Sequence, residues 1–262
     1  MKPEPFDFET FKEAFLLKFE KLEEEFYFRQ ATGYECADTG IISGTWGSNP
    51  ETFFFMNLRI RNLWPIRANI TDYNEVKLFT VIEFLYDYVS EPQNKTYHDW
   101  NYCGWHTFDY DVEKGKKRYR DEMNSILNEY KSGYELSESG EVLQCPPNGY
   151  EQIFNEIEKT NDPSNIDDRV ALAINKFRRY NASIDEKKDA VRTLADVLEY
   201  LKKGGIVLSN KDDSDLFNII NHFDLRHHNR YQQGDYNKEI WYDWLFYTFL
   251  ASINVLLKLG KK

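Results

Sequence analysis

The stretch Ser214–Leu259, SDLFNIINHFDLRHHNRYQQGDYNKEIWYDWLFYTFLASINVLLKL, decides how the C-terminal part of the chain folds. Its first residues repeat apolar side chains at helical spacing, and Ile240–Leu259 is an aromatic, apolar run that again fits a helix. Between them lies a polar centre, residues 221–230, which holds three of the five histidines of the chain. A dense polar segment between two core-forming helices is where we look for chemistry.

Two more helices are predicted on the N-terminal side of this stretch. Ser183 and Glu186 have the spacing of a capping box, and Gly204-Gly205 ends the helix that the box begins. The four predicted helices cover about residues 167–180, 183–203, 215–223 and 237–259. Because their connections are short, they predict an antiparallel four-helix bundle over residues 164–262.

The first 160 residues mix helical patterns with turn-rich segments. Helices are predicted at about 10–28, 76–89, 114–130 and 150–158, a short strand at 40–45 and a β-hairpin near 133–143. The apolar segment 52–63 fits either a helix or a strand. Turn residues at 160–163 suggest a domain boundary. The expected fold class is therefore mainly α, with a helical N-terminal domain (1–160) that carries a small hairpin and a C-terminal bundle (164–262).

Charge is unevenly distributed along the chain. The 262 residues have a net charge of −11, whereas residues 164–262 contain 16 Lys and Arg against 14 Asp and Glu. The excess negative charge therefore lies in the N-terminal part. A negative charge repels RNA, but this argument against an RNA substrate is weaker for residues 164–262, which are close to neutral. Three widely spaced cysteines argue against a disulfide scaffold, and no signal-peptide pattern is present, so a cytoplasmic protein is expected. Polar residues within 240–259 favour a core helix over a membrane span.

The polar centre contains the side chains that metal-independent RNA cleavage needs. Histidine titrates in the range required for proton transfer, and arginine can grip phosphate oxygens in a bidentate way. The candidate catalytic residues are Arg226, His227, His228 and Asn229, and the candidate substrate-binding residues are Asn221, Arg230 and Gln233. The alternative is a network at the end of a helix, in which these side chains bond carbonyls and neighbouring acids.

The same residues carry a family resemblance. Leu216–Asn221 running into Leu225-Arg226-His227-His228-Asn229, followed by an aromatic helix, resembles the HEPN superfamily, and most of all the HEPN-type C-terminal regions of AbiJ-like abortive-infection proteins of bacteria. The hairpin that follows the helix at 114–130 resembles the N-terminal domains joined to those regions.

The resemblance implies a function in antiviral defence. Active HEPN proteins are metal-independent ribonucleases that pair as homodimers, with a catalytic groove at the interface. On this basis we expect RNA as substrate, a homodimer formed through the C-terminal bundle, no cofactor and a regulatory partner protein. The polarity of residues 240–259 separately predicts no membrane association. Such a ribonuclease should be kept inactive until infection, and we expect the acidic N-terminal domain to act as its sensor or inhibitor.

The chain departs from the family mark, an arginine separated from a histidine by four to six residues. The histidines next to Arg226 follow it by one and two positions, and the family positions hold Tyr231, Gln232 and Gln233. Only Arg226 is assigned a catalytic role from its position in the family motif. His227 and His228 are assigned one because histidine can transfer protons. A second hypothesis is therefore a catalytically inactive module that dimerises and binds a partner protein or a nucleotide signal.

A second candidate site lies in an aromatic segment of the N-terminal domain. His98, Cys103 and His106 are three ligands that could hold zinc, with Cys145 or Asp99 as the fourth. Their spacing matches no standard zinc module. The neighbouring aromatics also fit a packed loop, a surface for base stacking or partner binding, or a cover over a small-ligand pocket.

Overall fold

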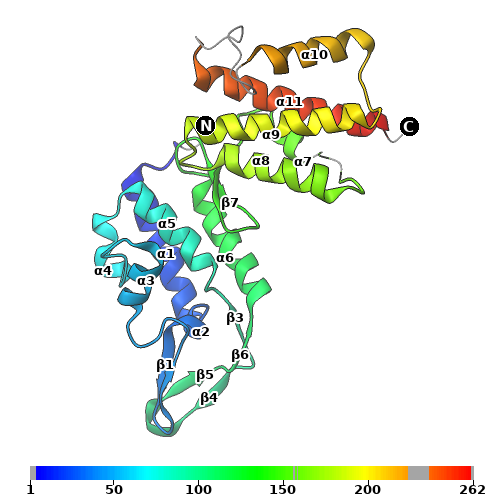
Figure 1. Cartoon of the computed structure of the whole chain (residues 1–262). Coiled ribbons are helices and arrows are strands. Elements are labelled where there is room, and N and C mark those ends of the chain that lie inside the picture. The colour runs from blue at the N-terminus through cyan, green and yellow to red at the C-terminus, as the bar shows by residue number, and fades with distance from the viewer. Residues whose placement is uncertain (1–3, 156, 158, 224–235, 261–262) are drawn as a thin grey trace. The chain divides into compact units, whose positions relative to one another are not determined.

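The computed structural model describes residues 4–155, 157, 159–223 and 236–260, and the chain is mainly helical, at 59% helix, with small antiparallel strand pairs. It divides into two compact units, Met1–Cys145 and Pro146–Lys262 (Figure 1). This division precedes the expected boundary at 160–163. The reason is the short helix α7 (Glu151–Asn155), whose Phe154 contacts Phe246 of the C-terminal unit.

Three long helices form the core of the N-terminal unit: α1 (Phe8–Glu24), α5 (Glu75–Tyr86) and α6 (Val112–Leu127). The helical repeat expected from the sequence is confirmed in α1, where Phe11, Phe15 and Phe19 are buried. Shorter helices cover this core: α2 (Arg29–Thr32), α3 (Pro50–Leu58) and α4 (Ile66–Asn69), followed by the 3-10 turn η1 (Ile70–Asp72). The apolar segment at 52–63 is thus helical in its first half, because Asn49 caps the Thr52 amide and Pro50 occupies the first turn.

Four antiparallel strand pairs complete the N-terminal unit. Strand β1 (Gly33–Cys36) pairs with β2 (Gly40–Ser43), β3 (Glu91–Gln93) with β6 (Asp109–Asp111), β4 (Thr96–His98) with β5 (Gly104–His106), and β7 (Tyr134–Leu136) with β8 (Val142–Gln144). The β7–β8 pair is the predicted hairpin. The β4–β5 pair and the turn η2 (Trp100–Tyr102) between its strands were not expected from the sequence.

A close backbone approach fixes the start of α6 against β3. A Cβ atom on Gly115 would lie 2.4 Å from Cα of Ser90, so only glycine fits at this position. The contact holds the end of α5 and the beginning of β3 next to α6. This contact therefore holds in place the backbone from which the β3–β6 pair, and beyond it the β4–β5 pair, extends.

Helices α8 (Asp168–Arg178), α9 (Ile184–Lys203), α10 (Asn210–His222) and α11 (Lys238–Gly260) share one hydrophobic core in the C-terminal unit. A π-helical turn, η3 (Pro163–Asp167), leads into α8. The predicted capping box is confirmed, since Ser183 accepts from the Glu186 amide while the Glu186 carboxylate accepts from Ser183. Helix α10 begins earlier than expected because Ser209 caps it.

Helix α11 is the one element in the described residues that is long and apolar enough to cross a membrane. Half of its most apolar window is buried, and Leu245, Phe249 and Ile253 belong to the core shared with the other helices. The ring of Phe246 also stacks on that of Phe177 of α8, with centroids 3.8 Å apart. This packing supports the interpretation of α11 as a core helix.

Candidate metal centre

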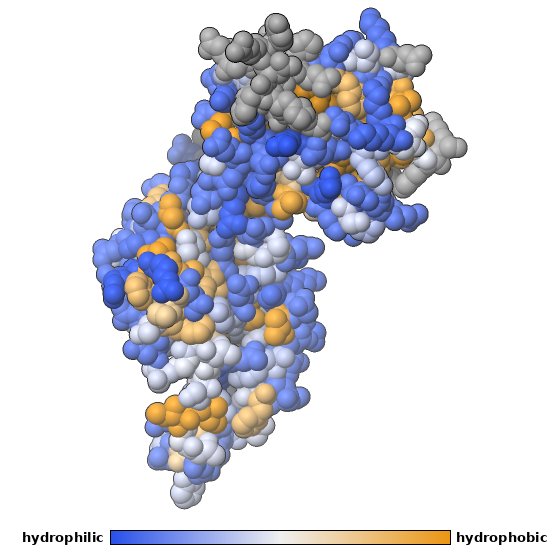
Figure 2. All heavy atoms as spheres, viewed as in Figure 1, coloured by the Kyte–Doolittle hydropathy of each residue, from blue (hydrophilic) through white to orange (hydrophobic). Residues whose placement is uncertain are grey.

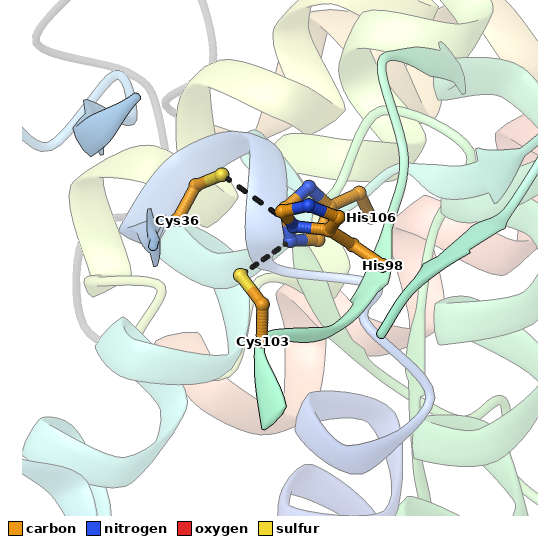
Figure 3. Close-up of side chains that lie close together, drawn as sticks. All are labelled: Cys36, His98, Cys103 and His106. Carbon is orange, nitrogen blue, oxygen red and sulfur yellow. Dashed lines mark hydrogen bonds between the residues drawn. The ribbon is translucent and has the colours of Figure 1, made fainter. Parts of the chain in front are cut away.

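Two hairpins of the N-terminal unit bring two cysteines and two histidines together. Cys36 is the last residue of β1, His98 ends β4, Cys103 follows the turn η2, and His106 ends β5. One ligand atom from each lies within 4.8 Å of every other. Figure 3 shows the two thiols and the two imidazole rings pointing toward one another.

The spacing of the four side chains fits a tetrahedral metal ion. The Sγ atom of Cys103 lies 3.0 Å from Nε2 of His106, and the Sγ atom of Cys36 lies 3.9 Å from Nδ1 of His98. Zinc–sulfur and zinc–nitrogen bonds of about 2.3 and 2.0 Å place such ligand atoms roughly 3.3–3.8 Å apart in a tetrahedron. All four ligand atoms lie within 4.8 Å of one another, so the widest pair would have to close by up to about 1 Å to reach this geometry.

Backbone and hydroxyl donors surround both sulfur atoms. Hydrogen bonds from the Thr39 hydroxyl and from the backbone amides of Thr39 and Asp38 lower the pKa of the Cys36 thiol to about 7. The Ala37 amide donates to the Sγ atom of Cys103 across 3.3 Å. Because a metal binds the thiolate and not the thiol, the donors around Cys36 prepare it as a ligand.

The two histidines are oriented by different neighbours. The Nε2 atom of His98 lies 3.1 Å from Oδ2 of Asp38, so its Nδ1 atom is left to face Cys36. A carboxylate that holds the far nitrogen of a ligating histidine is a common outer-shell partner of zinc. His106 is buried beside the Tyr34 ring, at a centroid distance of 4.8 Å. Burial, followed by the charge of His98, lowers the pKa of His106 and favours the neutral, metal-binding form.

The structure brings the three ligands proposed from the sequence together and adds Cys36 as the fourth. Cys145 lies at the β7–β8 hairpin, where its thiol is 3.4 Å from Oδ1 of Asn128, and Asp99 is exposed beside the turn η2. Neither of the two expected fourth ligands belongs to the cluster. No signal in the sequence marked Cys36, because strand β1 was not predicted and nothing in the sequence pairs residues 33–43 with residues 98–106.

The predicted RNA-cleaving residues lie in a different unit. Arg226, His227, His228, Asn229, Arg230 and Gln233 lie outside the described residues, and Asn221 lies in α10 without a described side chain. The described residues on either side belong to the shared core. The ring of Phe223, at the end of α10, contacts Tyr236 and Trp241, at centroid distances of 5.2 Å in both cases.

The space beside the metal-ligand cluster is small. A cavity of about 180 Å³ is lined by residues of α2, of the β1–β2 hairpin and of 107–110, including Arg29, Tyr34 and Phe108. Pockets for small organic ligands commonly span about 300–1,000 Å³. A small-ligand sensor at this position would therefore need the pocket to enlarge.

No protein-family model, curated protein or solved structure matches the chain. The chemistry of its own residues is therefore the basis for assigning a function.

Proposed function

We propose that the N-terminal unit binds one Zn²⁺ ion through Cys36, His98, Cys103 and His106. The observation that carries this proposal is the convergence of two thiols and two imidazoles within 4.8 Å, from segments far apart in the sequence. Thiolate and imidazole together select zinc over the hard cations Mg²⁺ and Ca²⁺, which prefer oxygen ligands.

The role of the ion is structural. Four protein ligands complete a tetrahedral shell and leave no open position for water or substrate, as is typical of structural zinc sites. The strands that carry the ligands are only three or four residues long and form separate two-stranded pairs. Isolated two-stranded pairs are marginal in water, so an ion that joins β1–β2 to β4–β5 stabilises both.

The test is the zinc content of the purified, full-length chain and of two matched cysteine variants, measured by mass spectrometry of the metal. We expect one zinc per wild-type chain, a loss of most of it in Cys36→Ser, and full retention in Cys145→Ser. Replacement by Co²⁺ should give the visible spectrum of a tetrahedral, thiolate-bound ion. Equal zinc content in the two variants would contradict the assignment.

A second proposal concerns the C-terminal unit, which we propose to be a HEPN-like, metal-independent ribonuclease that acts in bacterial antiviral defence by abortive infection. Two observations support it: α8 to α11 share one core, and the polar segment with Arg226, His227 and His228 connects the last two of these helices. Arg226 would stabilise the negative charge on the phosphorane oxygens, one histidine would act as base or acid, and Asn229 would orient them. The reaction would take place in the cytoplasm.

A homodimer is part of the second proposal. Helix α11 exposes Trp241, Trp244, Val255 and Leu259, which follow one another along one face with the half-buried Thr248 and Ala251. Spacings of three and four residues place these side chains in a single stripe. An exposed apolar stripe is typical of an interface between protein chains, and it supports pairing of two C-terminal units.

Growth and total-RNA integrity in cells would test the ribonuclease proposal, with wild type, Arg226→Ala and His228→Ala produced at matched levels. Arg192→Ala, an exposed arginine of α9, is the control. We expect wild type and the control to stop growth with RNA cut, and the other two variants to be harmless. Intact RNA in the wild type during phage challenge would favour the alternative, an inactive HEPN-like module that binds a partner protein or a nucleotide signal.

A further inference from the structure

The segment that supplies three of the zinc ligands also exposes five large aromatic side chains. Trp100 is 67% and Tyr102 is 95% exposed, and the other three are between 49% and 68% exposed. We define the aromatic tip as Tyr97, Trp100, Tyr102, Trp105 and Phe108. Elsewhere in the N-terminal unit most large aromatic side chains, such as Phe28 and Trp46, are buried. Exposure at the tip is therefore a local feature.

The backbone at the tip holds these rings outward. Asn101 and Tyr102 both have left-handed conformations, with φ of 51° and 57°, which non-glycine residues adopt rarely. Tyr97 and Trp105 are opposite each other in the β4–β5 register, with ring centroids 5.2 Å apart, while the next residue in each strand is a zinc ligand. Because side chains alternate along a strand, turning the histidines toward the ion turns this ring pair toward solvent.

The charge around the aromatic tip is negative. Residues 33–43 and 96–108 contain Glu35, Asp38 and Asp99, all exposed, and contain neither lysine nor arginine. Two thiolates balance the charge of one Zn²⁺, so the bound ion adds no positive charge. The nearest basic side chains make contacts of their own: Arg29 donates to the Trp105 carbonyl, and Lys95 lies over the Phe26 ring.

Aromatic faces next to carboxylates suit a cationic group. Lysine and arginine stack on Trp and Tyr rings through cation–π attraction, and a neighbouring carboxylate adds an ion pair. Phosphate would be repelled by the same carboxylates, and nucleic-acid binding depends on lysine and arginine, which residues 33–43 and 96–108 do not contain. Figure 2 shows that the end of the N-terminal unit that carries β4 and β5 is largely white and orange, with less blue than the helices of that unit.

We propose that the aromatic tip is a docking surface for a lysine- or arginine-rich segment of a partner protein, an inference that rests on the proposed zinc site because the ion holds the tip together. Trp100 and Tyr102, which lie between the ligands His98 and Cys103, are the central contacts. Glu35, Asp38 and Asp99 supply the complementary charge. Rigid aromatic anchors with few rotatable bonds are frequent hot spots of protein interfaces.

The probe is a library of random dodecapeptides displayed on phage, selected in parallel on the full-length zinc protein and on its Trp100→Ala/Tyr102→Ala variant. The parallel selection removes peptides that bind only because the chain is acidic overall. We expect peptides recovered on the wild type alone to be enriched in lysine and arginine. One such peptide, labelled with fluorescein, should bind the double variant about tenfold or more weakly, and Leu172→Ala, an exposed position of the C-terminal unit, should leave its affinity unchanged.

Zinc content, measured on every sample, separates this inference from the zinc proposal. Zinc present with identical peptide pools on wild type and double variant would overturn the docking surface alone. Binding of a labelled uridine dodecamer that depends on Trp100 and Tyr102 would also overturn it, in favour of a nucleic-acid surface. Peptide binding that depends on both residues in a protein without zinc would support the docking surface and overturn the metal site.

Discussion

Asp38 has the role of an orienting residue at the metal-ligand cluster, because its carboxylate lies 3.1 Å from the nitrogen of His98 that faces away from Cys36. We expect Asp38→Asn to weaken zinc binding by about 10–100-fold, as outer-shell changes commonly do, while the fold is retained. Competition with a coloured zinc chelator measures this change. Glu35→Gln, which removes a neighbouring exposed carboxylate, is the control. An unchanged zinc affinity in Asp38→Asn would show that His98 does not depend on this contact.

Glu122 is a carboxylate of the N-terminal unit with three cationic partners. It is nearly buried on α6 and lies 2.5 Å from Nζ of Lys18, 3.1 Å from Nζ of Lys21 and 2.7 Å from Nη2 of Arg118. Burial alone would raise its pKa, but the hydrogen bonds from Lys18 and Lys21 and the nearby positive charges outweigh burial and lower it. The ionised carboxylate therefore stabilises the contact between α1 and α6.

We expect Glu122→Gln to lower the free energy of unfolding by about 1–3 kcal/mol at pH 7, because three cationic groups lose their shared partner. A carboxylate with a lowered folded-state pKa contributes stability above its unfolded pKa of about 4.3, and this contribution is lost as the pH falls through the folded value. The difference between wild type and variant in urea unfolding should thus shrink below about pH 4. The matched control is Glu13→Gln, which neutralises an exposed acid of α1; a pH-independent difference in Glu122→Gln would refute the ionic explanation.

At the level of elements, the first turn of α9 is fixed by hydrogen bonds between residues three positions apart. The hydroxyl of Ser183 accepts from the amide of Glu186, and the Glu186 carboxylate accepts in return from Ser183. We expect Ser183→Ala to reduce the free energy of unfolding of the C-terminal unit by about 1 kcal/mol. Ser183→Thr keeps the hydroxyl and should retain most of the stability. Equal losses in both variants, measured by denaturant unfolding, would argue against the capping role.

Helix α11 has one face in the core and an apolar stripe on the surface. We expect wild type to be dimeric in solution and Trp244→Glu/Val255→Glu to be monomeric, because two charges would have to be buried at the interface. Light scattering coupled to size exclusion gives the molar mass. Leu172→Glu, on an exposed position of α8, should remain dimeric. A monomeric wild type at high concentration would remove the support that the stripe gives to the HEPN-like proposal.

At the scale of the whole molecule, each unit has a core of its own, and within the described residues the metal-ligand cluster lies in the N-terminal unit. Chelation of zinc should therefore increase amide hydrogen exchange in β1–β2 and β4–β5, while α8 and α9 keep their protection. Mass spectrometry of peptic fragments locates the change. The same increase in α9 as in β4–β5 would mean that the metal supports both units.

The sequence by itself determined the elements that depend on local interactions. Side-chain periodicity marked α1, α5 and α6, and the capping box marked the first turn of α9, because apolar spacing and cap hydrogen bonds involve residues only three or four positions apart. The hairpin β7–β8 followed from its alternating residues and central turn in the same way.

Only the tertiary structure decided which distant residues meet. The zinc-ligand set needed Cys36 beside His98, and this contact depends on how two short hairpins are placed, which no periodicity encodes. The boundary between the units likewise depended on α7 packing against α11. The HEPN-like function stays a proposal, since its candidate catalytic residues, Arg226 to Asn229, lie outside the described residues. Local order follows from neighbours in sequence, whereas a site built from separate segments follows from long-range packing.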